Sequence, residues 1–186
     1  MSSSVAKSIS ITVSDTVHVS GLLQNPPHGR ACYVLAHGAG AGMNHPFMAA
    51  VAAELARRGI GTLRYQFPYM ERGAKRPDPP RLAQATVRAA VGAARGLLPE
   101  SPLIAGGKSF GGRMTAQAQA KAPLQGVCGL GFLGFPLHPA GRPSQERAAH
   151  LFDVQIPMLF LQEHATLWRR SIKLSRFARN LATAQR

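Results

Sequence analysis

Strand-like and helix-like segments alternate along this chain, and this alternation constrains the fold more than any other feature. Short apolar runs bounded by glycine, proline or polar residues predict buried strands, and longer alanine-rich segments predict helices. The predicted strands span residues 31–36, 60–65, 102–106, 127–132 and 156–161. The predicted helices span residues 47–58, 81–98 and 112–122, with a short helix near 144–151. Such alternation predicts a mostly parallel sheet between two layers of helices.

The remaining features of the chain agree with one soluble domain. Two strand-like stretches, SISITVS and HVSGLLQ, predict a hairpin near the N-terminus. The chain has 186 residues, of which 45% are hydrophobic, enough for a sizeable core. The first residues, MSSSVAKSISITV, contain no long apolar run, so we expect neither a signal peptide nor a membrane span. Cys32 and Cys128 lie in apolar stretches, and we expect buried free thiols in a reducing compartment, the cytoplasm.

The stretch LIAGGKSFGGRM, Leu103 to Met114, contains the end of one motif and the whole of another. Its Gly-Lys-Ser letters could close a phosphate-binding P-loop, and its G-x-S-x-G letters could form a nucleophile elbow. The P-loop pattern requires a glycine five residues before Gly107, where this chain has Pro102. The apolar run also reaches almost to the serine, which leaves no room for a phosphate-binding loop. We therefore favour the elbow.

The elbow interpretation makes Ser109 the candidate nucleophile. A strand ends just before this serine and a helix is predicted just after it, so Ser109 lies on a strand-to-helix turn. Such a turn crowds its neighbours and requires small residues two before and two after the nucleophile. Gly107 and Gly111 occupy these positions. The alternative is a glycine-rich turn that holds a serine without any chemical role.

A second motif, HGAGAG, follows the predicted strand 31–36. In the α/β-hydrolase fold, a His-Gly loop after an early strand supplies one N–H group of the oxyanion hole, and the residue after the nucleophile supplies the other. The predicted donors are therefore Ala39 (or Gly40) and Phe110. We expect His37, with Gly38 and Gly40, to hold the shape of this loop and to have no catalytic role. Acyl transfer by a serine requires no cofactor and no metal ion.

The formal net charge of +14 would suit an acidic partner, but its distribution does not favour one. Most of the basic residues are arginines, spread singly or in pairs over residues 1–162. No basic run is interleaved with aromatic residues and no nucleic-acid-binding motif is present. We therefore expect a small-molecule acyl substrate as the partner, and neither nucleic acid nor a membrane. The sequence does not predict an oligomeric state.

Four segments in order carry a resemblance to a known family: LAHGAGAGMNHPFM, LRYQFPYM, GGKSFGGRM and GFPLHPAG. They resemble a group of small α/β-hydrolases related to dienelactone hydrolase, which includes the testis-expressed and NSL-complex hydrolase-like proteins. The resemblance covers about residues 9–162. It implies an α/β-hydrolase fold with Ser109 as nucleophile, acting on an ester or a lactone-like substrate. It does not imply a particular substrate.

The chain departs from this family after Gln162. The triad of the fold follows the order Ser, Asp, His, and the resemblance implies a Gly-Thr-Arg-Asp loop after the strand IPMLFLQ. This chain continues instead with residues 163–186, which contain six basic residues, one acidic residue and no Gly, Pro or Asp. Shifting the reading frame by one base at Gln162 allows Gly-Thr-Arg-Asp to be encoded. We therefore predict an incomplete hydrolase domain, 1–162, and a frameshift-derived tail, 163–186, a hypothesis that the gene sequence at codon 162 decides.

With the triad acid and base absent, we expect an impaired hydrolase. Glu163 and His164 are adjacent and cannot easily take two places that come from separate loops, and His138, His150 and Asp153 are weaker alternatives. Two further alternatives remain: a non-catalytic hydrolase-like protein, and a basic amphipathic tail that binds a partner or a membrane surface. In the second, one helical face would carry Leu167, Leu174, Phe177 and Leu181.

Overall fold

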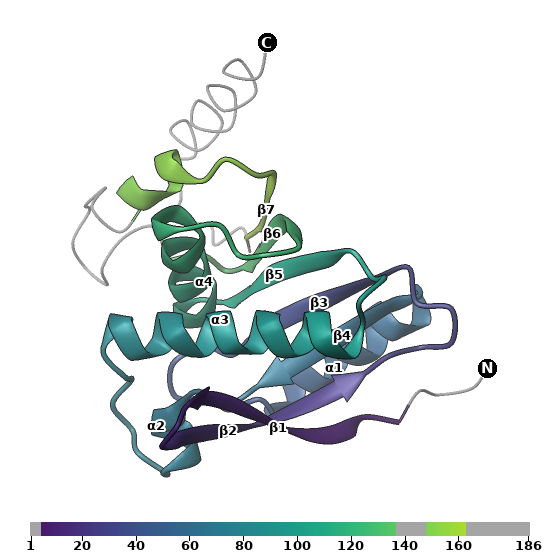
Figure 1. The fold of residues 1–186 in the computed structure, drawn as a ribbon, viewed down its shortest axis with the longest axis horizontal. Coiled ribbons are helices and arrows are strands. Elements are labelled where there is room, and N and C mark those ends of the chain that lie inside the picture. The colour runs from purple at the N-terminus through teal and green to yellow at the C-terminus, as the bar shows by residue number, and fades with distance from the viewer. Residues whose placement is uncertain (1–4, 137–147, 163–186) are drawn as a thin grey trace.

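The computed structural model describes residues 5–136 and 148–162, and its strands form one seven-stranded sheet (Figure 1). The strand order is β1-β2-β4-β3-β5-β6-β7. The strands are β1 (Lys7–Ser14), β2 (Val17–Gln24), β3 (Ala31–Ala36), β4 (Ile60–Tyr65), β5 (Leu103–Lys108), β6 (Val127–Leu133) and β7 (Met158–Leu161). The first two form the predicted antiparallel hairpin, β2 pairs antiparallel with β4, and every other pairing is parallel.

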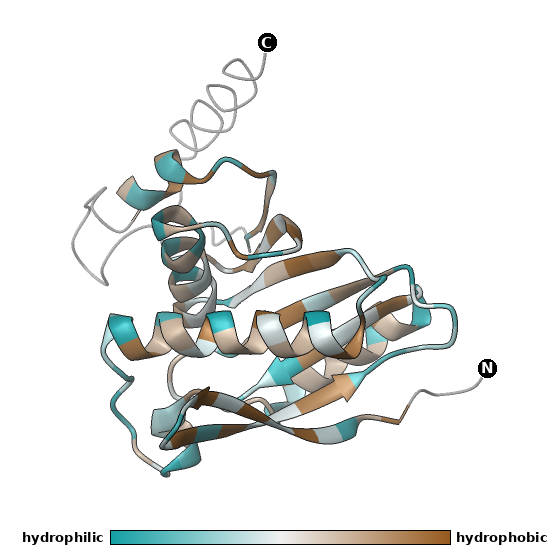
Figure 2. Cartoon of the chain, in the orientation of Figure 1, coloured by the Kyte–Doolittle hydropathy of each residue, from teal (hydrophilic) through white to brown (hydrophobic). Residues whose placement is uncertain are grey.

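Helices cover both faces of the sheet and give the predicted three layers. The α-helices are α1 (Pro46–Arg57), α2 (Pro68–Glu71), α3 (Pro80–Leu97) and α4 (Phe110–Lys121), and a 3-10 helix, η1, spans Ala149–Asp153. In Figure 1, α3 and α4 lie on the near face and α1 on the far face. Figure 2 shows hydrophilic residues recurring along α3, whose other face is buried against the sheet. The predicted fold class is therefore confirmed.

Strand β3 shows why the sheet needs helices on both faces. Its side chains alternate between the two faces, as in any strand, and residues 32–36 are all buried. Val34 and Ala36 belong to the main core with α3 and α4, whereas Tyr33 and Leu35 pack with Met48 of α1. A continuous apolar run of this kind is typical of a parallel strand that is covered on both sides.

Several elements differ from their predicted bounds. The helix predicted over 112–122 begins at Phe110, and the strand predicted over 102–106 continues to Lys108, because one residue makes the whole turn between them. Of the helix predicted near 144–151, residues 144–147 lie outside the described ranges, and the residues from Ala149 onward belong to the 3-10 helix η1. The segment 66–80, which lies between the predicted strand 60–65 and the predicted helix 81–98, contains the short helix α2, with Pro68 at its first position.

Cys32 is a buried free thiol as predicted, and burial raises its pKa to about 11. The prediction that Cys128 is also buried is wrong. Leu103 pairs with Val127 and Ile104 with Gly129, so Cys128 is the extra residue of a β-bulge. The bulge leaves the side chain exposed, and its thiol donates to the Leu103 carbonyl oxygen at 3.3 Å.

Strand β7 lies at one edge of the sheet in the part of the chain that the structure describes. Leu159 and Leu161 are 60% and 54% exposed, whereas Met158 and Phe160 pack against the main core. The expectations for residues 163–186 lie outside the described residues. Among the helices of residues 5–136 and 148–162, none is both long enough and apolar enough to cross a bilayer.

Candidate active site

Ser109 lies between the end of β5 and the start of α4, in a strained backbone conformation. Its φ is 47° and its ψ is −108°, and only one other non-glycine residue of the described chain, His28, has a positive φ. A side chain in this region crowds its own backbone, at a cost of about 1–3 kcal/mol. The turn places the serine at the carboxyl end of β5 and at the positive end of the α4 dipole.

The glycines that flank Ser109 allow the backbone of α4 to approach β3 closely. A Cβ atom added to Gly107, whose φ is 152°, would overlap the carbonyl oxygen of Ala36. A Cβ atom added to Gly111 would lie 2.5 Å from the carbonyl oxygen of His37. Both obstacles are backbone atoms, which cannot rotate away. The elbow therefore requires glycine at both positions.

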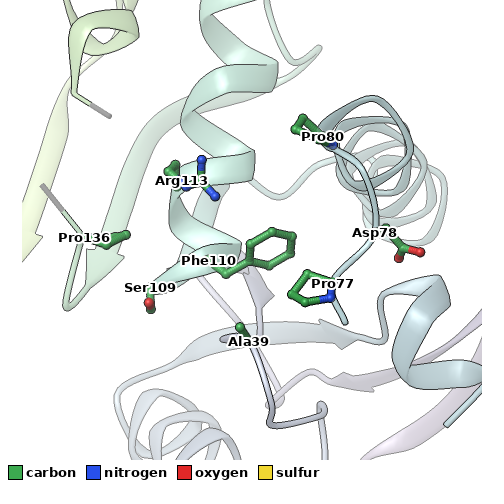
Figure 3. Close-up of a pocket in the computed structure, with 8 residues that line it drawn as sticks. All are labelled: Ala39, Pro77, Asp78, Pro80, Ser109, Phe110, Arg113 and Pro136. Atoms are coloured by element: carbon green, nitrogen blue, oxygen red, sulfur yellow. The ribbon is translucent and has the colours of Figure 1, made fainter. Parts of the chain in front are cut away.

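A cavity of about 350 Å³ lies at Ser109 (Figure 3). Its walls are formed by Ala39, Pro77, Asp78, Pro80, Ser109, Phe110, Arg113 and Pro136. Phe110 is the first residue of α4, so its N–H group has no acceptor within the helix. The structure thus brings Ser109, Phe110 and Ala39 together, from segments about 70 residues apart in the sequence. Their catalytic roles remain predictions.

His37 anchors the loop that carries Ala39. The imidazole is fully buried, and its Nε2 accepts the Phe67 N–H at 3.0 Å. Because Nε2 accepts, the proton of the neutral ring lies on Nδ1, which donates to the Gly38 carbonyl oxygen at 2.8 Å. Burial lowers the pKa of His37, and the bond to Gly38 offsets this only in part. These contacts are those of a residue that holds the loop in shape.

The neutral state of His37 makes the stability of the fold depend on pH. The unfolded histidine takes up a proton near pH 6.5 and the folded one only below that, so the free energy of unfolding falls as the pH drops below about 6.5. The slope approaches about 1.4 kcal/mol per pH unit for one such proton. We expect His37→Gln, which keeps an acceptor for Phe67 but does not titrate, to reduce this slope in urea unfolding between pH 5 and 7.5. Equal slopes for both proteins would contradict this assignment.

Asp78 is the one carboxylate among the described cavity residues, and the sequence did not predict it. It is buried, and its carboxylate accepts the Tyr69 N–H at 2.9 Å and an Arg72 N–H at 3.0 Å. Both oxygens are therefore engaged in holding the loop after α2. The available signal was its position in the long segment between the predicted strand 60–65 and the predicted helix 81–98. Nearby, the Arg113 guanidinium lies 5.9 Å from the centre of the Phe110 ring.

The other titratable candidates that fall within the described residues do not line the cavity at Ser109. His150 and Asp153 belong to η1 and are not among the cavity residues. Burial, and then the charge of Arg113, lower the pKa of His150. His138, Glu163 and His164 lie outside the described residues. Within the described ranges, no group of three or more His, Cys, Asp or Glu residues could hold a metal ion.

This sheet order, with a strained serine between β5 and a helix, defines an α/β-hydrolase fold. Residues 29–167 match the family described as alpha/beta hydrolase domain, and the chain belongs to that family. The narrower resemblance to testis-expressed and NSL-complex hydrolase-like proteins remains a prediction. No protein of curated function matches the chain.

Solved structures agree with the fold. A dienelactone hydrolase from Anabaena variabilis has 19% identity and a TM-score of 0.66, over 94% of this chain and 93% of that one. A serine hydrolase without a lid, XC6422 from Xanthomonas campestris, has 22% identity and a TM-score of 0.67, over 85% and 71%. An α/β serine hydrolase homologue from Coxiella burnetii has 16% identity and a TM-score of 0.64, over 94% and 97%.

Proposed function

We propose that this protein is a serine hydrolase that acts on a small ester or lactone, with Ser109 as its nucleophile. The observation that carries the proposal is the strained Ser109 backbone at the wall of the cavity. Strain of this kind persists at functional sites because the surrounding structure imposes it. The name of the Anabaena variabilis neighbour, a dienelactone hydrolase, supports a lactone or ester.

The proposed reaction is acyl transfer to water. The Ser109 hydroxyl oxygen attacks the carbonyl carbon, a base takes the hydroxyl proton, and the carbonyl oxygen becomes an oxyanion. The N–H groups of Phe110 and Ala39 would donate to this oxygen. The base then returns the proton to the leaving group, and water attacks the acyl-enzyme in a second, equivalent cycle.

The cavity supports a small substrate. Its volume is near the lower end of the range for ligand pockets, about 300–1,000 Å³. The lining is largely apolar, with three prolines and Phe110, so an acyl group of a few carbons fits it better than a long chain. We also propose a cytoplasmic location, which is supported by the free thiols of Cys32 and Cys128.

We further propose that this chain is a weak catalyst. A histidine would have to take the Ser109 proton, and no histidine lines the described part of the cavity. The carboxylate there, Asp78, is bound to Tyr69 and Arg72, and none of the described histidines contacts it. The place of the triad acid is inferred from the family resemblance, which implies an acid-bearing loop directly after β7.

A fluorophosphonate probe tests the nucleophile directly. We expect slow covalent labelling of the intact protein, located at Ser109 by peptide mass spectrometry, because the oxyanion donors also stabilise phosphonylation. Ser109→Ala should remain unlabelled. If the wild-type protein is not labelled at millimolar probe over a day, the nucleophile assignment is wrong and the protein is a non-catalytic relative.

A further inference from the structure

The loop between β3 and α1 is held at Met43 by two side chains from the end of β4. The Met43 N–H donates to Gln66 Oε1 at 2.8 Å, and Arg64 Nη1 donates to the Met43 carbonyl oxygen at 3.1 Å. Residues two apart along an extended chain point to the same side, so Arg64 and Gln66 bind the two sides of one residue. Met43 itself is buried.

The loop is shaped to receive the Gln66 amide. A Cβ atom added to Gly42 would lie 2.9 Å from both Gln66 Nε2 and Gln66 Oε1. The glycine therefore leaves the space that the amide occupies. At the other end of the loop, His37 is bound by the Phe67 N–H. Residues 64–67 thus supply the anchors at both ends of residues 38–42, the segment that carries Ala39.

Arg64 is costly for the stability of the fold. The residue is 5% exposed, it makes no ion pair with any described residue, and its Nε has no hydrogen-bond partner among them. Burial also lowers its pKa. A buried cation without a carboxylate is destabilising, and an apolar residue of similar size would be more favourable. A side chain with this cost needs a reason other than packing.

We propose that Gln66 and Arg64 are positioning residues for the oxyanion hole: by fixing Met43 they fix the loop and the Ala39 N–H relative to Ser109. This inference rests on the proposed function, because the Ala39 N–H has an oxyanion to stabilise only if Ser109 attacks a carbonyl group. The two residues do not touch the substrate. They act through the backbone of the loop, and the charged donor of Arg64 gives a stronger hydrogen bond than a neutral one.

The chain offers matched controls with the same chemistry elsewhere. Gln119 Oε1 accepts the Leu124 N–H at 2.8 Å, as Gln66 does for Met43. Arg88 donates to the carbonyl oxygens of Ala118 and Ala122, as Arg64 does for Met43. Both controls join α3, α4 and the segment after α4, away from the loop. The test therefore compares Gln66→Leu with Gln119→Leu, and Arg64→Met with Arg88→Met.

Two measurements are made on each full-length variant: amide hydrogen exchange of peptides that cover residues 38–45, and the rate of fluorophosphonate labelling at Ser109. We expect Gln66→Leu and Arg64→Met to speed amide exchange in this segment about 10-fold or more. We expect both to slow labelling about 10–100-fold, which is part of the 10²–10³-fold loss of rate seen when an oxyanion donor is removed. Gln66→Glu keeps an acceptor for Met43 and should retain the protection.

The control variants should change neither quantity, even where they lower overall stability. Unchanged exchange in both loop variants, or an equal change in Gln119→Leu, would overturn the proposal. If the wild-type protein is not labelled, the proposed function fails, whereas the exchange data still decide whether the two residues position the loop. Should Arg64→Met not fold, the comparison of Gln66→Leu, Gln66→Glu and Gln119→Leu decides alone.

Discussion

Hydrolysis of p-nitrophenyl acetate by the 186-residue chain is expected to be slow, about 10⁶-fold below the rate of a hydrolase with a complete triad. Loss of the base removes about this factor and leaves roughly 10³–10⁴ over water, which comes from the oxyanion hole and substrate binding. The physical reason is that Ser109 must lose its proton as it attacks, and no histidine lines the described cavity to accept it.

The measurement is the steady-state rate with purified wild-type protein, Ser109→Ala and His150→Gln. Among the described residues, His150 is the histidine that follows Ser109 in the sequence and could be considered as the base. It belongs to η1, however, and does not line the cavity. We expect its replacement to leave the rate unchanged. A rapid turnover that Ser109→Ala abolishes would show that a working base exists, and a loss of that turnover in His150→Gln would identify the base.

Replacement of Gly107 by alanine is expected to lower the stability of the fold strongly. The new Cβ atom would overlap the Ala36 carbonyl oxygen, a backbone atom held in the β3–β5 pairing, and the φ of 152° is unfavourable for alanine. Relief requires β3 and β5 to separate, so we expect a loss of more than about 4 kcal/mol in the free energy of unfolding. Gly111→Ala should follow, because its Cβ would lie 2.5 Å from the His37 carbonyl oxygen.

Gly92→Ala is the control for this prediction. Gly92 lies in the middle of α3, and a Cβ atom there would meet nothing within 4 Å. Alanine in a helix interior is more favourable than glycine by roughly 0.5–1 kcal/mol. Urea unfolding should therefore show Gly92→Ala to be slightly more stable than the wild type. A Gly107→Ala protein within about 1 kcal/mol of the wild type would contradict the elbow geometry.

The sequence predicted the layers and most strands because those depend on local patterns. The strands at 31–36 and 60–65 match β3 and β4 at both ends, since each begins within two residues of a glycine, Gly29 or Gly59. The bulge at Cys128 depends instead on the register between β5 and β6. The start of α4 depends on a turn that only tertiary contacts make possible. Neither is encoded in a single segment.

The candidate site shows the same difference between features set by local sequence patterns and features set by tertiary contacts. Ser109, Phe110 and Ala39 could be predicted to meet because both loops follow parallel strands, whose carboxyl ends lie at one edge of the sheet. The hydrogen bonds that fix this arrangement could not be predicted. Asp78 and Gln66 bind backbone N–H groups of Tyr69 and Met43, and no sequence pattern marks such contacts. Their partners become known only once the chain is folded.

The strained backbone of Ser109 also carries information about the history of the sequence. Glycine adopts a positive φ without the cost that serine bears, so replacement of Ser109 by glycine would relieve the strain and stabilise the elbow. The presence of Ser109 at φ 47° is what selection for a reactive group would leave behind.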